Sequence, residues 1–494
     1  MDILTAVTAA GLLLIAVGIS GRRYSPLTIL AGLGVLGVSI VGRLVYGGGL
    51  FEVGVELFRD AGLALLVAAV WLVIRKPHPG AKPFFFLGLL ALLLSGVLYL
   101  AGRTVGLLVQ EEMASVLVEL GPDDEIDEIG TALQRFGAVA EQAFPTVDLS
   151  ADEDLAQVYL VHVAADAVRE LVAVLRADGE NVDFAEINTE VALPPIVAGG
   201  TTAGAARRYL ENDPRVGEQW ALEAIHGHEM HSMLQELQPV RKARVAILDT
   251  GVDGSHEDLA DVMSTSGLTD VHGHGTHCAG IAGAVTNNGL GIASLNWEGR
   301  FIELLAFEAL GDAGRGSLEQ IAQAIIDATQ AEADIISMSL GAMAPVRPRV
   351  LQTAIAFAQR NNVIVAASAG NSNEDAADHF PSNIDGVIAV AAVDHSLEKA
   401  EFSNTVGSLS RPIAAPGVDI LSSYPDNDYK PLNGTSMATP AVTGLLGVMR
   451  SLRPDLAAAD AYDILHETGT AVDATPLVGR VVNAEAAIEA LLTR

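Results

Sequence analysis

The sequence predicts an α/β protein with a mostly parallel central sheet, preceded by a small α+β module and by an N-terminal bundle of four transmembrane helices. Three observations predict this order. The first hundred residues are almost all Leu, Ala, Val, Ile and Gly. The segment after them alternates between helical and strand patterns. Further along, residues 245–248 form a short apolar run that is typical of a buried parallel strand, and Asp249 follows at its end.

Four apolar stretches cover about residues 3–20, 26–46, 60–74 and 84–102. Each is close to the ~20 residues that a helix needs to cross a bilayer. Buried core helices are the alternative, but four such stretches in succession, with almost no charge inside them, disfavour it. A cleavable signal peptide also fits the first stretch poorly, because Asp2 and no basic residue precedes it. We therefore expect residues 1–105 to form a four-helix membrane anchor.

Basic residues give the expected orientation of this anchor. They gather in the first and third turns between the stretches, as Arg22 and Arg23, and as Arg75, Lys76 and Lys82. By the positive-inside rule these turns face the cytoplasm, so everything after about residue 105 faces outward. The chain is thus expected to be a multi-pass protein of the cell membrane that contacts the lipid bilayer. A transport function has no support, because Arg43, near a helix end, is the ionisable residue inside the spans.

Residues 106–193 are expected to form the small α+β module. Residues 126–143 have the apolar spacing of a helix. Residues 157–163 (QVYLVHV) have the pattern of a strand, and residues 166–175 have the pattern of an amphipathic helix. Residues 182–193 complete the module as a final strand, which two prolines end. Residues 194–208 then form a linker of small residues without periodicity.

The charge after residue 105 is strongly negative. The chain holds 29 Lys or Arg and 61 Asp or Glu; residues 1–105 hold eight and four of these, which leaves 21 basic and 57 acidic groups, a net charge of −36. Such a surface repels nucleic acid, and this class of partner is set aside. Acid-rich surfaces with few lysines occur in proteins from saline habitats, where salt screens the repulsion between like charges. An organism from a saline habitat is therefore one candidate source of this protein. The single cysteine, Cys278, excludes an intramolecular disulfide.

Three short segments carry candidate catalytic groups. Residues 244–252 (RVAILDTGV) bring Asp249 to the carboxyl end of a strand, where α/β folds hold their sites, although strands ending in Asp are common. Residues 272–283 (HGHGTHCAGIAG) surround His274 with glycines and small residues that suit a tightly packed helix. Its three histidines also admit a zinc site, which the lack of an HExxH pattern disfavours.

The third segment, residues 433–440 (NGTSMATP), holds Ser436 between small residues. A serine at a helix N-terminus can present its hydroxyl where the backbone N–H groups and the helix dipole favour a developing oxyanion. A plain N-cap serine is the alternative for this segment taken alone. The three candidate groups follow one another along the chain in the order Asp, His, Ser, and this order favours a catalytic triad over three unrelated roles.

From about residue 209 to residue 492 the sequence resembles the subtilisin-like serine proteases, and especially their thermitase-like branch. The matching segments are NDPRVGEQW, VAILDTGV, HGHGTHCAGIAG, TNNGLGIA, ISMSLG, VIVAASAGN and NGTSMATP. The resemblance implies a three-layer subtilisin-like fold over residues 209–494 and a serine endopeptidase that acts through an acyl-enzyme. Ser436 would be the nucleophile, His274 the general base and Asp249 the group that orients the base. Asn371 would contribute to the oxyanion hole.

The resemblance also implies how protein or peptide substrates bind. They would add as a β-strand between two segments of the enzyme. Ser339, Leu340 and Gly341 would form one side, Gly314 to Gly316 the other, and Ala366 to Gly370 a pocket wall. The Gly that usually follows SLG in the family is Ala342 here, and the segment SNEDAADHF after Asn371 is strongly acidic.

A calcium site carries over from the thermitase-like branch. Its ligands are matched by two carboxylates and by the loop of residues 285–292, which would contribute one side-chain amide and several backbone oxygens. The residues implied are Asp213, Asp258, Val285, Asn288, Leu290 and Ile292. Carboxylate, amide and carbonyl oxygens suit Ca²⁺. The alternative is an ordinary turn beside two surface acids.

The module of residues 106–193 resembles the inhibitory propeptide of this family, and VDFAEIN is similar to that propeptide's last strand. The chain would then be a zymogen with its own module as partner, and we expect self-cleavage within residues 198–209. A plain spacer is the alternative for the module.

For the whole chain, a catalytically silent peptide-binding sensor is the alternative, which the presence of Asp249, His274, Ser436 and Asn371 argues against. Cys278, one helical turn after His274, is expected to be a small buried apolar residue near the base.

Overall fold

The computed structural model describes residues 113–195, 197–200, 209–264 and 269–494. The expected membrane anchor, residues 1–105, lies outside these ranges. Among the described residues, no helix is long and apolar enough to cross a membrane. The chain divides into two compact units, Met1–Met113 and Ala114–Arg494, and the second unit is described below.

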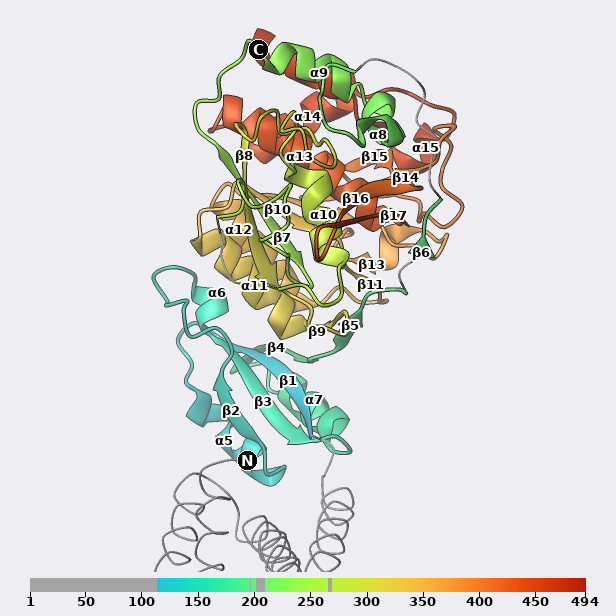
Figure 1. Cartoon of the computed structure of the whole chain (residues 1–494). Coiled ribbons are helices and arrows are strands. Elements are labelled where there is room, and N and C mark those ends of the chain that lie inside the picture. Colours follow the sequence, from blue (N-terminus) through green and yellow to red (C-terminus); the bar gives the residue numbers. More distant parts are fainter. Residues whose placement is uncertain (1–112, 196, 201–208, 265–268) are drawn as a thin grey trace, which may run out of the picture. The chain divides into compact units, whose positions relative to one another are not determined.

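Seven parallel strands form the central sheet, in the order β18-β15-β14-β12-β10-β7-β8 (Figure 1). Their bounds are β7 (Ala243–Asp249), β8 (Ile302–Glu308), β10 (Ile335–Met338), β12 (Ile364–Ser368), β14 (Ile388–Val393), β15 (Pro412–Pro416) and β18 (Arg480–Val481). From β7 the chain passes to β8 on one side and then to β10 on the other. This reversal opens a crevice at the carboxyl end of β7, which is where open α/β sheets hold their ligands.

Helices cover both faces of the sheet. Side chains alternate along each strand, so that Val245 and Ile247 of β7 belong to one core cluster and Ala246 and Leu248 to the other. The first cluster packs under α10 (His274–Gly283), α13 (Thr435–Leu452), α14 (Ala458–Thr468) and α16 (Ala484–Thr493). The second packs under α11 (Leu318–Gln330) and α12 (Arg349–Arg360). The predicted α/β fold with a large parallel sheet is thereby confirmed.

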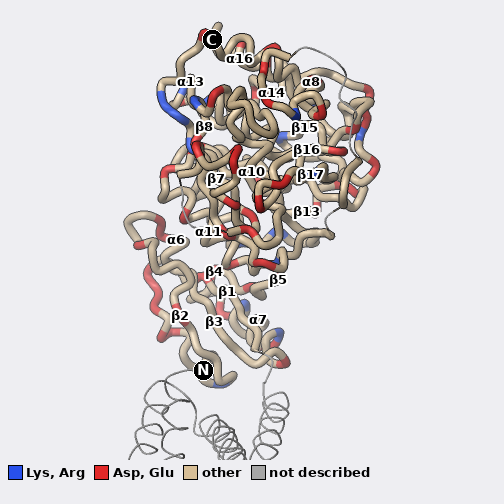
Figure 2. Tube along the Cα trace, in the orientation of Figure 1, with Lys and Arg blue, Asp and Glu red and all other residues tan. Residues whose placement is uncertain are grey.

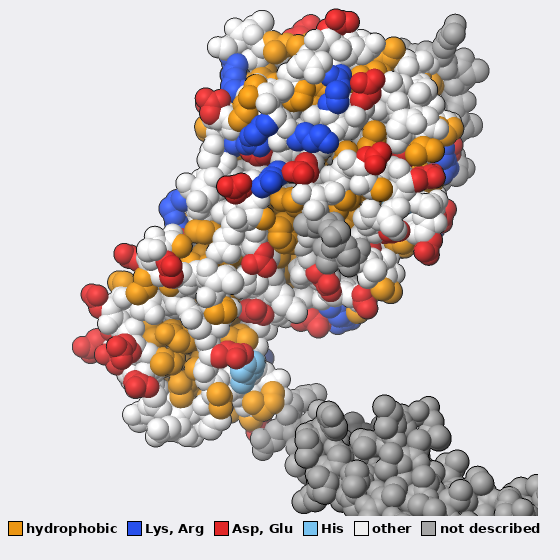
Figure 3. All heavy atoms as spheres, turned by 60° about the vertical axis from the view of Figure 1, so that its left-hand side comes forward, with side chains coloured by type: hydrophobic (Ala, Val, Ile, Leu, Met, Phe, Trp, Pro, Cys, Tyr) orange, Lys and Arg blue, Asp and Glu red, His pale blue; other side chains and the backbone are white. Residues whose placement is uncertain are grey.

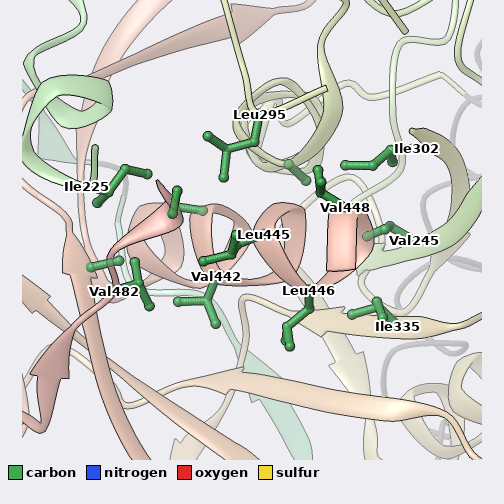
Figure 4. Packing of buried hydrophobic residues seen from close by; sticks show 14 of the residues in the cluster. Ile225, Val245, Leu295, Ile302, Ile335, Val442, Leu445, Leu446, Val448 and Val482 are labelled. Atoms are coloured by element: carbon green, nitrogen blue, oxygen red, sulfur yellow. The ribbon is translucent and has the colours of Figure 1, made fainter. Parts of the chain in front are cut away.

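Helix α13 runs through the middle of the first core cluster. Val442, Leu445 and Leu446 recur at helical spacing in this cluster, and Figure 4 shows Val245 of β7 and Ile335 of β10 near the end of the helix that holds Leu446 and Val448. Burying each such side chain contributes roughly 1.5–3 kcal/mol. On another side of α13, Gly444 lies against Ala282 of α10: a Cβ atom at position 444 would be 2.6 Å from the Ala282 carbonyl oxygen. The small residues noted in the sequence thus allow these two helices to touch backbone to backbone.

Smaller elements surround the sheet. Their bounds are α8 (Trp220–Ala224), α9 (Gly227–Leu234), α15 (Thr475–Val478), β9 (Arg315–Ser317), β11 (Ala342–Met343), β13 (His379–Phe380), β16 (Ile420–Tyr424) and β17 (Asp428–Asn433), with short 3-10 helices η2 (Val216–Glu218) and η3 (Ala376–Asp378). The strands β16 and β17 pair as an antiparallel hairpin. The strands β11 and β13 also pair antiparallel, next to the segment that ends β10.

The N-terminal module has a four-stranded sheet of its own, in the order β2-β3-β1-β4. Its elements are β1 (Met113–Leu120), η1 (Ile126–Ile129), α5 (Gly130–Arg135), β2 (Val139–Gln142), α6 (Glu153–Ala156), β3 (Val158–Ala164), α7 (Val168–Ala177) and β4 (Val182–Ile187). With two main helices between four strands, it is a split βαβ arrangement. The predicted strand at residues 157–163 and helix at residues 166–175 correspond to β3 and α7.

Two predictions within this module were wrong in extent. The helix predicted over residues 126–143 ends at Arg135, because Gly137 takes a φ of 60° and turns the chain into β2. The final strand predicted over residues 182–193 divides into β4 and β5 (Glu190–Ala192). Asn188 interrupts it: its N–H donates to the Ser115 carbonyl oxygen, and its side chain accepts from Glu319 N–H of α11. After that point the chain leaves the module's sheet.

Among the described residues, acidic side chains clearly outnumber basic ones. Figure 2 shows Asp and Glu spread along both the module and the C-terminal region, with far fewer Lys and Arg. On the face drawn in Figure 3, the Lys and Arg side chains gather mostly toward the upper part of the view. Like charges elsewhere on this surface repel one another, and salt reduces that repulsion.

Candidate active site

Asp249 and His274 meet at the carboxyl end of β7. Asp249 is the last residue of β7 and His274 the first of α10, and both side chains are buried. His274 Nδ1 donates to Asp249 Oδ1 over 2.7 Å. Burial lowers the pKa of His274, but the carboxylate of Asp249 and, to a lesser degree, Cys278 together raise it by more, and the pKa lies well above its ordinary value. The pair therefore holds the imidazole in one orientation and favours its protonated form.

A buried carboxylate that the sequence analysis missed supports this pair. Asp270 accepts hydrogen bonds from Thr250 Oγ1, Gly273 N–H, and both the N–H and the hydroxyl of Thr276, over 2.8–2.9 Å. It thus joins the turn after Asp249 to the first turn of α10. The signal in the sequence is an acid four residues before His274, where an uncompensated buried charge would be costly.

Ser436 is the second residue of α13 and is 5% exposed. Its hydroxyl donates to the Ser339 carbonyl oxygen over 3.2 Å, and Ser339 Oγ donates back to the Ser436 carbonyl oxygen over 2.9 Å. Among the described residues, no hydrogen bond joins Ser436 Oγ to His274. Both nevertheless line one cavity of about 240 Å³, and such contacts commonly tighten when substrate binds.

Asn371 lines the same cavity. Its Oδ1 accepts from both the N–H and the hydroxyl of Thr435, each over 2.9 Å. The amide nitrogen Nδ2 makes no hydrogen bond within the part of the chain that the structure describes, so it remains available as a donor. Ser436, at the start of α13, also presents a backbone N–H without a partner inside the helix.

The segments predicted to bind substrate do not themselves line this cavity. Ser339, Leu340 and Gly341 follow β10 directly, and Leu340 is buried. Gly314 and Gly316 belong to the opposite segment around β9. That segment is already paired: β5 of the module's tail lies antiparallel to β9, with Val191 opposite Gly316, and Leu193 N–H donates to the Gly314 carbonyl oxygen over 2.8 Å.

The tail continues into the cavity itself. Pro194, Pro195 and Val197 line it together with His274 and Ser436. Beyond them, β6 (Val197–Ala198) pairs antiparallel with residues 432 and 433 of β17. The described residues of the tail therefore pair with β9, line the cavity that holds the serine, and pair with β17.

The remaining candidates near the triad have other partners. Cys278 is buried, its thiol donates to the Ser436 carbonyl oxygen over 3.5 Å, and burial raises the thiol pKa. His277 Nε2 lies 2.8 Å from the Lys430 carbonyl oxygen, and burial lowers the His277 pKa to about 3. His274 Nδ1 is hydrogen-bonded to Asp249 and His277 Nε2 faces the Lys430 carbonyl oxygen, so the three histidines of this segment do not converge on one ion. Asp249, His274 and Cys278 do lie close enough together to hold a metal, but the first two are joined by the hydrogen bond of the pair.

The loop predicted to bind calcium closes over two buried carboxylates. Asp213 accepts from Asn287 N–H and Asn288 N–H, and Asp258 accepts from Ile292 N–H and Asn288 Nδ2, all within 3.1 Å. Burial, and to a lesser degree the charge of Asp258, raise the pKa of Asp213 to about 6. The carbonyl oxygens of the implied ligands accept no hydrogen bond in the described part of the chain; these residues are Val285, Leu290 and Ile292. Paired anions beside free carbonyls fit a cation such as Ca²⁺.

Comparison with known proteins gives consistent matches. The model of the subtilase family (Peptidase_S8) matches residues 241–482. Subtilisin DY of Bacillus licheniformis is 37% identical over 258 residues, which cover 50% of this chain and 90% of that protein. Thermitase of Thermoactinomyces vulgaris is 41% identical over 217 residues, 42% of this chain and 75% of thermitase.

Two further matches extend over more of the chain. The alkaline protease of Alkalihalobacillus alcalophilus is 31% identical over 387 residues, which cover 73% of this chain and 98% of that protein. Among solved structures, a protease of Pseudoalteromonas arctica matches with a TM-score of 0.51 and 28% identity, over 57% of this chain and 99% of the other.

Proposed function

This chain belongs to the subtilase family and is a subtilisin-like serine endopeptidase, and on that premise we propose that it is a membrane-anchored zymogen that cleaves proteins or peptides outside the cytoplasm. The observation that carries the zymogen proposal is the pairing of β5 with β9, which leads the chain's own tail into the cavity that Ser436 lines. An added strand is also how a peptide substrate would bind.

In the proposed mechanism, Ser436 Oγ attacks the carbonyl carbon of the scissile peptide bond and His274 Nε2 takes the hydroxyl proton. Asp249 holds the other ring nitrogen and stabilises the imidazolium. His274 then gives the proton to the leaving amine, and an acyl-enzyme on Ser436 remains until water hydrolyses it. The 2.7 Å hydrogen bond supports these roles, because it leaves Nε2 of His274 as the nitrogen that can face the serine.

Asn371 and the backbone of Ser436 are the proposed oxyanion hole. Thr435 fixes the amide of Asn371 so that its nitrogen is free to donate, and that nitrogen belongs to a residue lining the cavity. The negative charge that develops on the carbonyl oxygen would meet both donors. Such donors act mainly in the transition state and lower the barrier rather than improve substrate binding.

The N-terminal module would act as the inhibitor of its own enzyme. Side chains of the module, such as Leu117, Phe144 and Phe184, share a core cluster with Ile321 and Ile355 of the helices α11 and α12. This shared apolar contact would help to hold the tail against β9. A plain spacer would need neither the shared core nor the strand in the groove.

The proline pair explains how the tail could inhibit without being consumed. Pro194 and Pro195 line the cavity beside Ser436, and a bond to proline has no N–H at its leaving nitrogen and a fixed backbone. The self-cleavage proposed within residues 198–209 would then follow release of the tail from the groove, or be made by a second molecule. Release of the module would free the cavity for substrates.

Membrane anchoring is proposed for residues 1–105, with the module at residues 106–193, the linker at residues 194–208 and the peptidase domain at residues 209–494. The four apolar stretches and their basic turns support a multi-pass anchor in the lipid bilayer with the peptidase outside. A structural Ca²⁺ is proposed on Asp213, Asp258 and the loop of residues 285–292, where it would neutralise two buried acids.

Labelling with a fluorophosphonate probe tests the catalytic proposal on the full-length chain in isolated membranes. Wild type should react once the module is released, and Ser436→Ala should not. Ser451→Ala, at a buried serine of the same helix, is the matched control and should label like wild type. Failure of the released wild type to label or to hydrolyse peptides would favour the silent sensor instead.

The topology is tested by external protease on intact cells or spheroplasts. A tag after residue 105 should be removed and a tag in the turn of residues 75–82 should be protected. The opposite pattern would overturn the proposed orientation.

A further inference from the structure

We infer that Glu211, His228 and His231 bind a divalent transition-metal ion, with Zn²⁺ as the best match. Glu211 follows the linker closely, whereas both histidines belong to α9 and lie three residues apart, on one face of the helix. One carboxylate oxygen and two imidazole nitrogens come within 4.8 Å of one another. The cluster shares no residue with the triad or with the proposed calcium ligands.

The protonation of His231 provides the first argument. His231 is fully buried, and its Nε2 lies 2.7 Å from the Ser294 carbonyl oxygen, which can only accept a hydrogen bond. Nε2 therefore carries a proton. In the neutral ring the lone pair is then on Nδ1, which faces Glu211 Oε1. Two atoms that both carry lone pairs repel each other unless a cation or an additional proton lies between them.

Glu211 provides the second argument. Its residue is 6% exposed, and its oxygen Oε2 has no hydrogen-bond partner among the described residues. A buried carboxylate oxygen without a partner is costly. The other oxygen already faces both His231 and His228, whose Nδ1 lies 2.9 Å away. A metal ion coordinated by the carboxylate would satisfy the oxygen that the protein leaves unpaired.

The donor types indicate which ion would bind. Two imidazole nitrogens and one carboxylate form a set that Zn²⁺ commonly uses, whereas Ca²⁺ prefers oxygen ligands. The hydrogen bond from His231 to the Ser294 carbonyl is the kind of outer contact that fixes a metal-bound imidazole. Aromatic rings enclose the cluster, with Tyr209 4.9 Å from the ring of His228 and Trp297 5.5 Å from the ring of His231. A position in which Glu211 and His231 are buried favours a structural ion over a catalytic one.

Such an ion would fasten the start of the peptidase domain to its body. Glu211 lies between the linker and Asp213, and α9 packs against α16 in the first core cluster. If the linker is cut, the new N-terminal segment would depend on this cross-link and on the contacts of Asp213 with the loop of residues 285–292. This consequence rests on the proposed cleavage, but metal binding itself does not.

The inference is tested on full-length Ser436→Ala protein, in which self-cleavage is blocked. After stripping with a chelator and dialysis against Zn²⁺ in excess Ca²⁺, elemental analysis should find one Zn²⁺ per chain. Co²⁺ should give the visible absorption of a nitrogen- and oxygen-coordinated ion, and Cu²⁺ should quench tryptophan fluorescence through Trp297. None of these three readouts depends on peptidase activity.

Glu211→Gln and His228→Gln should reduce Zn²⁺ affinity by more than the roughly 10- to 100-fold that loss of an outer contact costs. His466→Gln, at an exposed histidine of α14, is the matched control and should bind Zn²⁺ like the parent. His228 is partly exposed, so its variant keeps the test valid if Glu211→Gln fails to fold. A parent protein that keeps no Zn²⁺, or variants that keep it undiminished, would overturn the inference and leave a buried carboxylate–imidazolium pair.

Discussion

The carboxylate of Glu186, near the end of β4, accepts a 2.9 Å hydrogen bond from the backbone N–H of Val350 in the first turn of α12. It accepts a second one of equal length from Arg349 N–H. Helix α12 has no side-chain cap of its own, since Pro348 precedes it. The N-terminal module thus supplies the anion that this end of a peptidase helix lacks.

Glu186→Ala should therefore weaken the hold of the module on the peptidase. Loss of a helix cap costs about 0.5–2 kcal/mol, equivalent to a few-fold to about 30-fold faster escape from inhibition. The measurement is the basal hydrolysis of a peptide substrate by full-length protein before any cleavage. Glu180→Ala, at an exposed acid of the same module, serves as control and should leave basal hydrolysis unchanged. Equal basal rates in both variants would contradict the capping role.

Asn371→Ala should lower kcat far more than it raises KM. The amide of Asn371 is proposed to donate to the oxyanion, so its loss should cost about 3–4 kcal/mol of barrier, or a 10²–10³-fold lower kcat. Steady-state kinetics on the released peptidase provide the measurement. A variant that changes KM alone would show that Asn371 binds substrate in the ground state.

The stability of the module should depend on pH through Glu119. Burial, followed by the charge of Asp154, raises the pKa of Glu119 to about 7, above the ordinary value of 4.5 that applies to the unfolded chain. The folded state thus binds the proton more tightly, and this contribution to stability is complete below pH 4.5 and is lost as the pH rises through 7. Thermal unfolding of full-length Ser436→Ala protein between pH 5 and 8 should show the decline, and Glu119→Gln should flatten it. A module equally stable across this range would exclude the effect.

Calcium should raise the thermal midpoint of the peptidase domain. Binding to the folded state alone stabilises it by about 2.7 kcal/mol when the ion is at 100 times its Kd. Asp213→Asn combined with Asp258→Asn should abolish the response, because the neutral amides remove the charges that attract the ion. A midpoint in wild type that a calcium-specific chelator leaves unmoved would refute the site.

Self-cleavage should fall within residues 198–209 in wild type and be absent in Ser436→Ala. N-terminal sequencing of the smaller fragment measures the position. Pro195→Ala should create a bond that the serine can attack while the tail is still in the groove, so a new fragment starting near residue 195 should appear. Identical full-length bands in all three proteins would mean that the enzyme works uncut.

The sequence predicted the groups at the cavity because they lie in local patterns. Asp249 ends an apolar run, and His274 and Ser436 begin helices with small residues, so short segments suffice to identify each of them. That these segments come together at one site depends on the order of strands in the sheet, which the family resemblance supplied.

Features that depend on contacts between distant segments could not be predicted in this way. The break at Asn188 follows from a bond to α11, and the cap of α12 follows from Glu186 of the module. The Glu211 cluster joins residues 17 and 20 positions apart, and nothing in the local pattern of Glu211 points to α9. Strand β1 was missed for a local reason: its apolar run is only Val116 to Val118, with Ser115 before it and Glu119 after it, which is too short a pattern to stand out.

The backbone contact between Gly444 and Ala282 limits how far the helices that carry His274 and Ser436 can move relative to each other. It joins the helix that begins at His274 to the helix that begins with Thr435 and Ser436, about 12 Å along α13 from the serine. Because a misplacement of about 1 Å can slow a reaction a hundredfold, mild heating that loosens this crossing should silence the enzyme while its sheet is still intact. The temperature at which the enzyme stops working would then be lower than the temperature at which it melts, and the width of that gap would measure how firmly two glycine-lined helices hold each other.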